Sequence, residues 1–172
     1  MTDATNAPTI PSLVSYLQRR GACAESTTWL RNQPDPQTAW DTCQRGDWLL
    51  WLLGRLGVPR PRLVLAACAC ARLVLLHVRE GEGRPFHAIE TAEAWARGGE
   101  GAPTLAQVRN AADAADAAAD AAAAAYAAAY AAYAAADAYA ADAAARRQVW
   151  TQCADIVREQ FTWAEVAGLI GA

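Results

Sequence analysis

A close pair of cysteines is the most metal-like feature of the chain. Cys68 and Cys70 are separated by a single residue, and His77 follows seven positions after Cys70. Thiolate and imidazole groups are zinc ligands, but structural zinc sites space their paired cysteines two or more residues apart and use a second pair of ligands. Because cysteine is also common as a small core residue, the sequence predicts buried thiols here and no metal site.

A second cluster places His87 near Glu90 and Glu93, at helical spacing. We interpret it as a solvated helix face rather than an acid–base site. The chain contains no phosphate-binding glycine loop, no nucleophile elbow and no zinc-protease motif. We therefore expect a protein without catalytic residues and without a cofactor.

Asp47, Arg72 and Glu90 are the charged residues that an enzyme would have to join into one polar centre. Arg72 interrupts a run too apolar to face water, so its guanidinium needs a carboxylate partner. Asp47 directly follows a glycine, where it can cap the next helix. We interpret all three residues as structural.

Two stripes of polar and aromatic residues run along an alanine-rich segment. At about 100° per residue, three aspartates share one stripe and three tyrosines lie on another. The six residues are Asp113, Asp116 and Asp120, with Tyr126, Tyr130 and Tyr133. One interpretation is that tyrosine packs on neighbouring helices while aspartate keeps the helix hydrated. The other is a recognition surface, because tyrosine is enriched at interface hot spots and acidic stripes attract basic partners. We take the six as candidate partner-binding residues.

The composition of the whole chain limits which fold can position these residues. The chain has 172 residues, of which 45 are alanine. Other apolar residues make up 28% of it, which is enough for a compact core and excludes disorder over most of the length. The net charge is −3, so the chain lacks the basic footprint of a nucleic-acid-binding protein. Residues 111–145 contain 26 alanines, five aspartates and no basic residue.

Helical periods and caps predict an all-α fold, a multi-helix bundle with one long alanine-rich helix. Ser12, Asp35 and the pair Thr162 and Glu165 are expected to cap helices. Alanine is the best helix former, so residues 111–145 are expected to form one helix of at least 25 residues. We expect its alanine face, which includes Ala114 and Ala143, to pack closely on helices rich in Trp and Leu. Seven tryptophans, at positions 29, 40, 48, 51, 95, 150 and 163, are interpreted as packing between helices.

The domain organisation predicted from these patterns is simple. Residues 1–8 are expected to form a flexible tail, and residues 9–172 a single helical domain with an alanine-rich segment at 104–148. The N-terminus has no export signal and the cysteine count is odd, at five. Reduced thiols and a cytoplasmic location are therefore expected, with no membrane or nucleic-acid partner and an undefined oligomeric state.

The spacing of tryptophan, arginine and glycine resembles a bacterial immunity-protein family, the Imm-5-like group. The similarity is carried by the segments Trp40–Trp51, Cys70–Arg72, Arg84–Trp95 and Cys153–Arg158, followed by Trp163. It spans roughly residues 38–170. The resemblance implies an all-helical cytosolic protein, assigned from genomic association to neutralise a cognate toxin, and it carries over no toxin-contacting residues.

The sequence leaves three functions open. The first is an immunity-type binding protein that neutralises a bacterial toxin by protein–protein contact. The second is a structural or assembly protein, of a phage or a cell, that self-associates through its Ala/Tyr-rich helix. The third is an enzyme built on Asp47, Arg72 and Glu90. The sequence favours the first.

Overall fold

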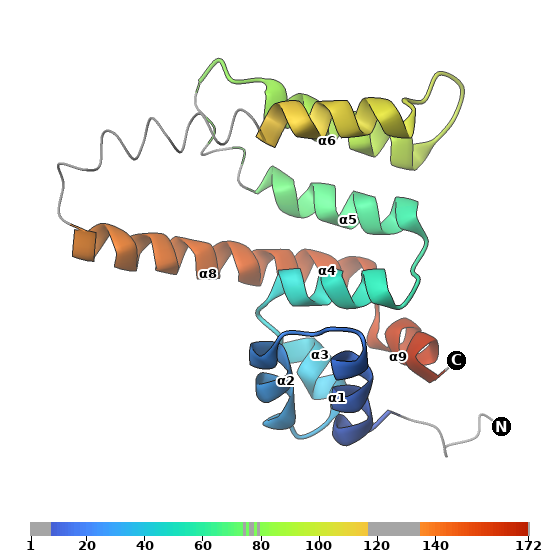
Figure 1. Cartoon of the computed structure of the whole chain (residues 1–172), viewed down its shortest axis with the longest axis vertical. Helices are drawn as coiled ribbons and strands as arrows, with labels where there is room; N and C mark the ends of the chain where they lie inside the picture. Colours follow the sequence, from blue (N-terminus) through green and yellow to red (C-terminus); the bar gives the residue numbers. More distant parts are fainter. Residues whose placement is uncertain (1–7, 74, 76–77, 79, 117–134, 172) are drawn as a thin grey trace. The chain divides into compact units, whose positions relative to one another are not determined.

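The part of the chain that the structure describes is mainly helical. The computed structural model describes residues 8–73, 75, 78, 80–116 and 135–171, with side chains of the last range described from 143 to 170. Within these ranges there are helices and turns and no strand (Figure 1). The predicted all-α, multi-helix fold is therefore confirmed.

Backbone contacts divide the chain into two compact units. Unit 1 comprises Met1–Pro59 and Trp150–Ala172, and unit 2 comprises Arg60–Val149. The predicted organisation, a tail at residues 1–8 followed by a single helical domain, stays a prediction, and residues 1–7 lie outside the described residues.

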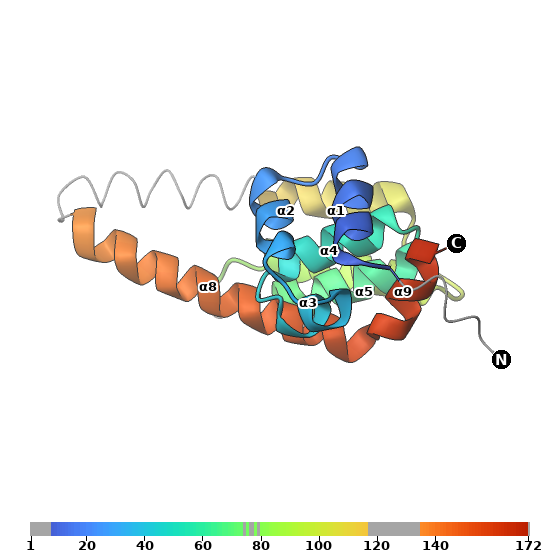
Figure 2. The same cartoon turned by 90° about the horizontal axis from the view of Figure 1, so that it is seen from below.

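Unit 1 is built from short helices at both ends of the chain. They are α1 (Ile10–Arg19), α2 (Ala24–Arg31), α3 (Pro36–Thr42), α4 (Gly46–Arg55), the end of α8 (Ala135–Gln160) and α9 (Trp163–Gly171). Helix α1 packs on α2, and α3 contacts α9 (Figure 2). The core between these helices is formed by leucine, valine and aromatic side chains. Its most buried members are Leu13, Leu30, Trp40, Leu49, Leu53, Val157, Phe161 and Val166.

Two of the predicted helix caps are confirmed. The carboxylate of Asp35 accepts the backbone N–H of Thr38 at 2.9 Å, at the start of α3. At the start of α9, Thr162 N–H donates to Glu165 Oε2 at 2.8 Å, and Glu165 N–H donates to the Thr162 hydroxyl at 3.3 Å. Both arrangements satisfy N–H groups that would otherwise lack a partner at a helix N-terminus.

Two other caps differ from the prediction. Helix α1 is capped by Thr9, and Ser12 lies in its first turn, where its hydroxyl accepts the N–H of Thr9 at 2.9 Å. Helix α4 begins at Gly46 with Arg45 at the N-cap position and no side-chain cap bond. Asp47 is therefore not a cap: Arg45 binds its carboxylate, and the acid complements the positive end of the helix dipole from the first turn.

The N-terminus of α4 lies directly against α8. A Cβ atom added at Gly46 would stand 2.4 Å from Cys153 Cβ and 2.7 Å from the backbone N of Ala154. Beside this contact, Arg158 Nη1 donates to the carbonyl oxygens of Cys43 at 2.7 Å and Trp40 at 3.2 Å. The end of α8 is thus fixed to the turn between α3 and α4 by close backbone packing and by a charged donor.

Unit 2 contains α5 (Arg60–Arg72), α6 (Arg84–Arg97), helical residues 105–116 and the first part of α8. Helix α5 packs along α6 (Figure 1). Ala66 on α5 and Ile89 on α6 are among its buried residues.

The alanine-rich segment is described only at its ends. Residues 105–116 and α8 from Ala135 onward are helical, while 117–134 lie outside the described residues, so the single long helix stays a prediction. Ala114 is exposed and Ala143 is half-buried. The expectation that Ala114 belongs to a close-packed face is wrong, because residues 105–116 pack through a different stripe, centred on buried Ala111.

Candidate functional site

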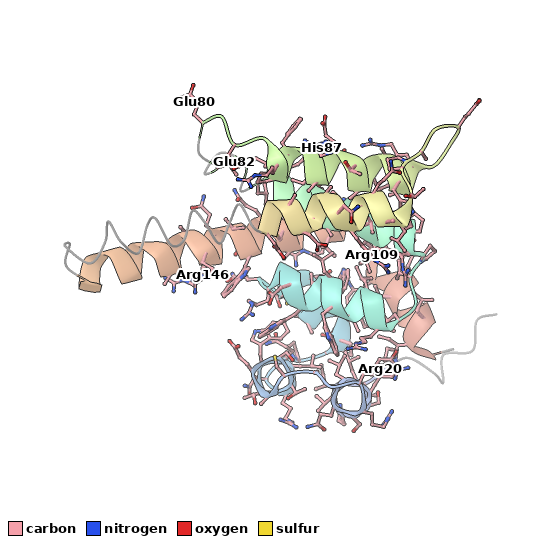
Figure 3. All side chains as sticks on the ribbon, turned by 45° about the horizontal axis from the view of Figure 1, so that its top comes forward. Arg20, Glu80, Glu82, His87, Arg109 and Arg146 are labelled. Carbon is pink, nitrogen blue, oxygen red and sulfur yellow. The ribbon has the colours of Figure 1, made fainter. Side chains whose placement is uncertain are left out.

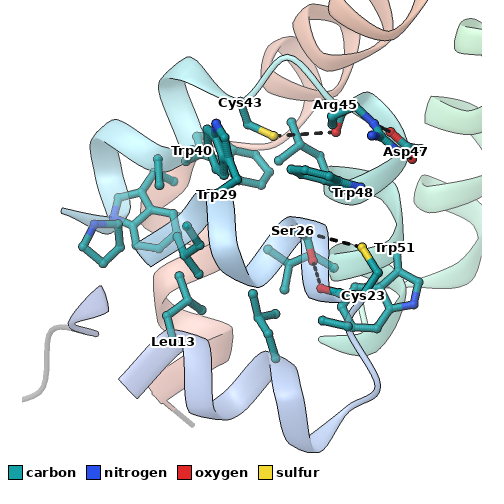
Figure 4. A pocket seen from close by; sticks show the side chains of 18 of the residues that line it. Leu13, Cys23, Ser26, Trp29, Trp40, Cys43, Arg45, Asp47, Trp48 and Trp51 are labelled. Atoms are coloured by element: carbon teal, nitrogen blue, oxygen red, sulfur yellow. Dashed lines mark hydrogen bonds and ion pairs between the residues drawn. The ribbon is translucent and has the colours of Figure 1, made fainter. Parts of the chain in front are cut away.

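An open cavity in unit 1 is the most developed candidate site. It has a volume of about 470 Å³ and lies among α1, α2, α3, α4 and α9 (Figure 4). Its lining is mainly apolar and unusually rich in tryptophan. The lining residues are Leu13, Leu17, Gly21, Ala22, Cys23, Ser26, Trp29, Leu30, Pro36, Ala39, Trp40, Cys43, Arg45, Asp47, Trp48, Leu49, Trp51, Leu52 and Trp163.

Tryptophan rings meet in tilted pairs beside this cavity. The ring centroids of Trp29 and Trp48 are 6.0 Å apart with the planes inclined by 58°. Those of Trp40 and Trp163 are 6.4 Å apart and inclined by 41°. Such pairs present both ring faces and ring edges to a neighbour. Trp40 is buried and the other three are half-buried. These rings therefore belong both to the core and to the wall of the cavity.

Arg45 forms a fixed polar element at the edge of the cavity. Its Nε donates to Asp47 Oδ1 at 2.8 Å, its Nη2 to Asp47 Oδ2 at 2.7 Å and its Nη1 to Glu25 Oε1 at 3.3 Å. The guanidinium also lies over the rings of Trp48 and Trp150, 4.4 and 4.0 Å from their centroids. Hydrogen bonding to Asp47 raises the pKa of Arg45 above its ordinary value. Ion pairs and ring faces therefore hold this cation in one place.

Two cysteines of the lining have opposite environments. Cys23 is exposed at the N-cap of α2, and its sulfur accepts the N–H of Ser26 at 3.5 Å. Hydrogen bonding from Ser26 lowers the pKa of the Cys23 thiol. Cys43 is buried, its thiol donates to the carbonyl of Arg45 at 3.7 Å, and burial raises its pKa. Cys23 is consequently the more reactive thiol of the two.

A second polar cluster lies in unit 2, between α5 and α6. Arg72 donates to Glu93 through Nε at 2.7 Å and Nη2 at 3.0 Å, and Arg97 adds a contact at 2.9 Å. Hydrogen bonds from Arg72, followed by those from Arg97, lower the pKa of Glu93 from 4.5 to about 2. The predicted carboxylate partner of Arg72 exists, and it is Glu93.

Of the three charged residues considered as a polar centre, Asp47 belongs to unit 1, whereas Arg72 and Glu90 belong to unit 2. Arg72 is bound to Glu93, Asp47 is bound to Arg45 in unit 1, and Glu90 is exposed on α6. His87, from the other predicted cluster, is also exposed on α6 (Figure 3). The structural role expected for Asp47, Arg72 and Glu90 stays a prediction.

The predicted recognition stripe is described in part. Asp113 and Asp116 are exposed, whereas Asp120, Tyr126, Tyr130 and Tyr133 lie outside the described residues. Cys68 and Cys70 are buried, as predicted, and burial raises the pKa of Cys68. His77 also lies outside the described residues, and in the described part of the chain no three potential ligands gather as a metal site.

Comparisons with known proteins found no relative of this chain. No protein-family model, curated protein or solved structure matches the chain. Among the described helices, none is long and apolar enough to cross a membrane.

Sequence reasoning assigned the tryptophans to helix packing and missed the cavity. The sequence does carry a signal for the position of Arg45, which lies between Trp40 and Trp48 along the chain. A single arginine near several indole rings is typical of a stacked, positioned cation.

Proposed function

We propose that this protein is an immunity-type binding protein that neutralises a cognate bacterial toxin by direct protein–protein contact. The resemblance of its tryptophan, arginine and glycine motifs to the immunity-protein family supports the proposal from the sequence. The observation that carries it from the structure is an exposed acidic surface, formed by Asp113 and Asp116 at the start of residues 111–145, which contain no basic residue.

The packing of residues 105–116 explains why this acidic surface is available. Ala111 is the buried residue of the segment, and Val108 and Ala115 are half-buried. Their spacing of three and four residues defines one helical stripe. Asp113 and Asp116 lie off this stripe, one helical turn apart, so the helix is attached on one side and exposes both carboxylates on another, which also carries the exposed Arg109.

This arrangement suits a basic partner more than an acidic or neutral one. The alanine-rich segment carries five aspartates and no base between residues 111 and 145. Several like charges on one surface attract an oppositely charged partner from distances of up to a Debye length. This attraction raises the association rate. A toxin with a basic active-site surface would therefore be bound and occluded.

The experiment is growth rescue combined with association kinetics. The adjacent reading frame is sequenced, its product is expressed with this protein in a bacterial host, and binding of the purified pair is measured by surface plasmon resonance. The double variant Asp113→Asn/Asp116→Asn should slow association roughly tenfold, with a weaker dependence on salt.

The matched control is Glu80→Gln/Glu100→Gln, which removes the same charge from exposed carboxylates elsewhere in unit 2. It should change association by much less. An absence of rescue, or an equal loss in both double variants, would contradict the proposal.

A second candidate function is self-association through the alanine-rich helix. Ala112 and Ala114 are exposed, as are Ala144 and Ala145 on α8. Small exposed side chains allow two helices to approach closely. Size-exclusion chromatography with light scattering tests it: a monomer at all concentrations argues against assembly, and a large defined oligomer argues for it.

A further inference from the structure

We infer that the tryptophan-lined cavity of unit 1 is a binding site for an uncharged aromatic small molecule. This site is separate from the acidic surface on which the proposed function rests, and neither depends on the other. The inference follows from the size of the cavity, its lining and the charges at its edge (Figure 4).

The volume is too large for a packing defect. Protein interiors contain few voids larger than a water molecule, whereas this one measures about 470 Å³. That value falls within the roughly 300–1,000 Å³ of small-molecule sites. Well-packed side chains surround it, since Leu13, Ala39 and Leu49 are each at most 4% exposed. A ligand-sized space therefore reaches into an otherwise dense core.

The lining selects an aromatic ligand. Five indole rings, from α2, α3, α4 and α9, line the space (Trp29, Trp40, Trp48, Trp51 and Trp163). The tilted Trp29–Trp48 pair, with centroids 6.0 Å apart, offers faces and edges for offset and edge-to-face contacts. A planar aromatic molecule makes such contacts with several rings at once, which a flexible aliphatic chain cannot do.

The charges at the edge favour a neutral ligand over an anion. Arg45 already donates to both carboxylate oxygens of Asp47 and to Glu25. An anion would have to displace these carboxylates, and it would be repelled by them. A cation would meet the guanidinium of Arg45, which already covers the face of Trp48. A neutral molecule meets neither penalty.

The hydroxyl and thiol groups of Ser26 and Cys43 in the lining are engaged with the protein itself. The Ser26 hydroxyl donates to the carbonyl of Cys23 at 2.9 Å, and the Cys43 thiol donates to the carbonyl of Arg45 at 3.7 Å. The site therefore fits a ligand whose affinity comes from ring contacts and burial.

The experiment uses two fluorescent probes that differ by one charge. N-phenyl-1-naphthylamine is neutral, and 8-anilino-1-naphthalenesulfonate has the same ring skeleton with a sulfonate added. Each is titrated into the full-length protein while probe emission and tryptophan quenching are followed. We expect the neutral probe to saturate at one per chain and the sulfonate to bind at least tenfold more weakly.

Variants at the mouth locate the binding. Ala22 lines the cavity in the turn between α1 and α2, whereas Ala24 begins α2, is exposed and does not line it. Ala22→Phe should weaken binding of the neutral probe at least tenfold, and Ala24→Phe should leave it unchanged. Circular dichroism and thermal unfolding verify that both variants are folded.

A third measurement needs no variant. Cys23 is the exposed thiol and also lines the cavity, so bound probe should slow its alkylation by iodoacetamide several-fold, as measured by mass spectrometry. The inference is overturned if the neutral probe does not saturate, if the sulfonate binds equally well, or if Cys23 reacts at the same rate with and without probe.

Discussion

Replacing Gly46 with alanine tests how closely α4 approaches α8. The backbone of Gly46 does not have a positive φ, so alanine can adopt its conformation. Space is the obstacle: the new Cβ would lie 2.4 Å from Cys153 Cβ and 2.7 Å from both Cys153 C and Ala154 N. Carbon atoms in contact prefer about 3.5–4.0 Å, so an overlap of more than 1 Å must be relieved.

The expected cost follows from what would have to move. Two of the three close atoms belong to the backbone of α8, which cannot rotate aside as a side chain can. Overpacking in cores costs about 1–3 kcal/mol, and this site belongs at the upper end, at about 2–3 kcal/mol. For a chain of this size the melting temperature should fall by roughly 4–12 °C.

The matched control is Gly168→Ala in α9. No atom lies within 4 Å of a Cβ built there, and alanine favours a helix over glycine by about 0.5–1 kcal/mol. This variant should therefore raise the melting temperature while Gly46→Ala lowers it, both measured by calorimetry. If Gly46→Ala is neutral or stabilising, the close contact between α4 and α8 is wrong.

The Arg72–Glu93 pair gives two further predictions. Arg72→Ala should lower the melting temperature more than Arg72→Met, because methionine keeps the volume of the side chain over α6; if both fold normally but lose a measurable activity, the structural role of Arg72 is refuted. Since the pKa of Glu93 falls from 4.5 to about 2 on folding, its contribution to stability is present above pH 4.5 and is lost as the pH falls toward 2. Urea unfolding between pH 5 and 2.5 should show a steeper loss for the natural protein than for Glu93→Gln, and parallel curves would contradict this assignment.

Local signals in the sequence were sufficient to predict the helices and several of their ends. Asp35 before a proline, and Thr162 three residues before Glu165, predict helix starts that the structure confirms. These features depend on residues within one turn of each other, so no knowledge of distant packing is needed.

Features that depend on how helices meet were not predictable in the same way. The sequence indicated that Arg72 needs a carboxylate, but it grouped Arg72 with Glu90 rather than Glu93. Glu93 follows buried Ile89 by four residues and so lies on the packed stripe of α6, a signal that was available. The cavity has no such signal, because its volume depends on the relative placement of five helices that share no local pattern.

The division of unit 1 between the two ends of the chain has a consequence for its synthesis. Among described residues, the largest fully buried side chains are Leu53 and three that follow Trp150, namely Val157, Phe161 and Val166. A ribosome therefore releases α1 to α4 long before the side chains that complete their core. Until the last 23 residues emerge, Trp40, Leu49 and Leu53 lack part of their cover, so a nascent or truncated chain presents an apolar surface to chaperones and proteases. For this protein, premature termination near the C-terminus is expected to be as damaging as loss of the first helices.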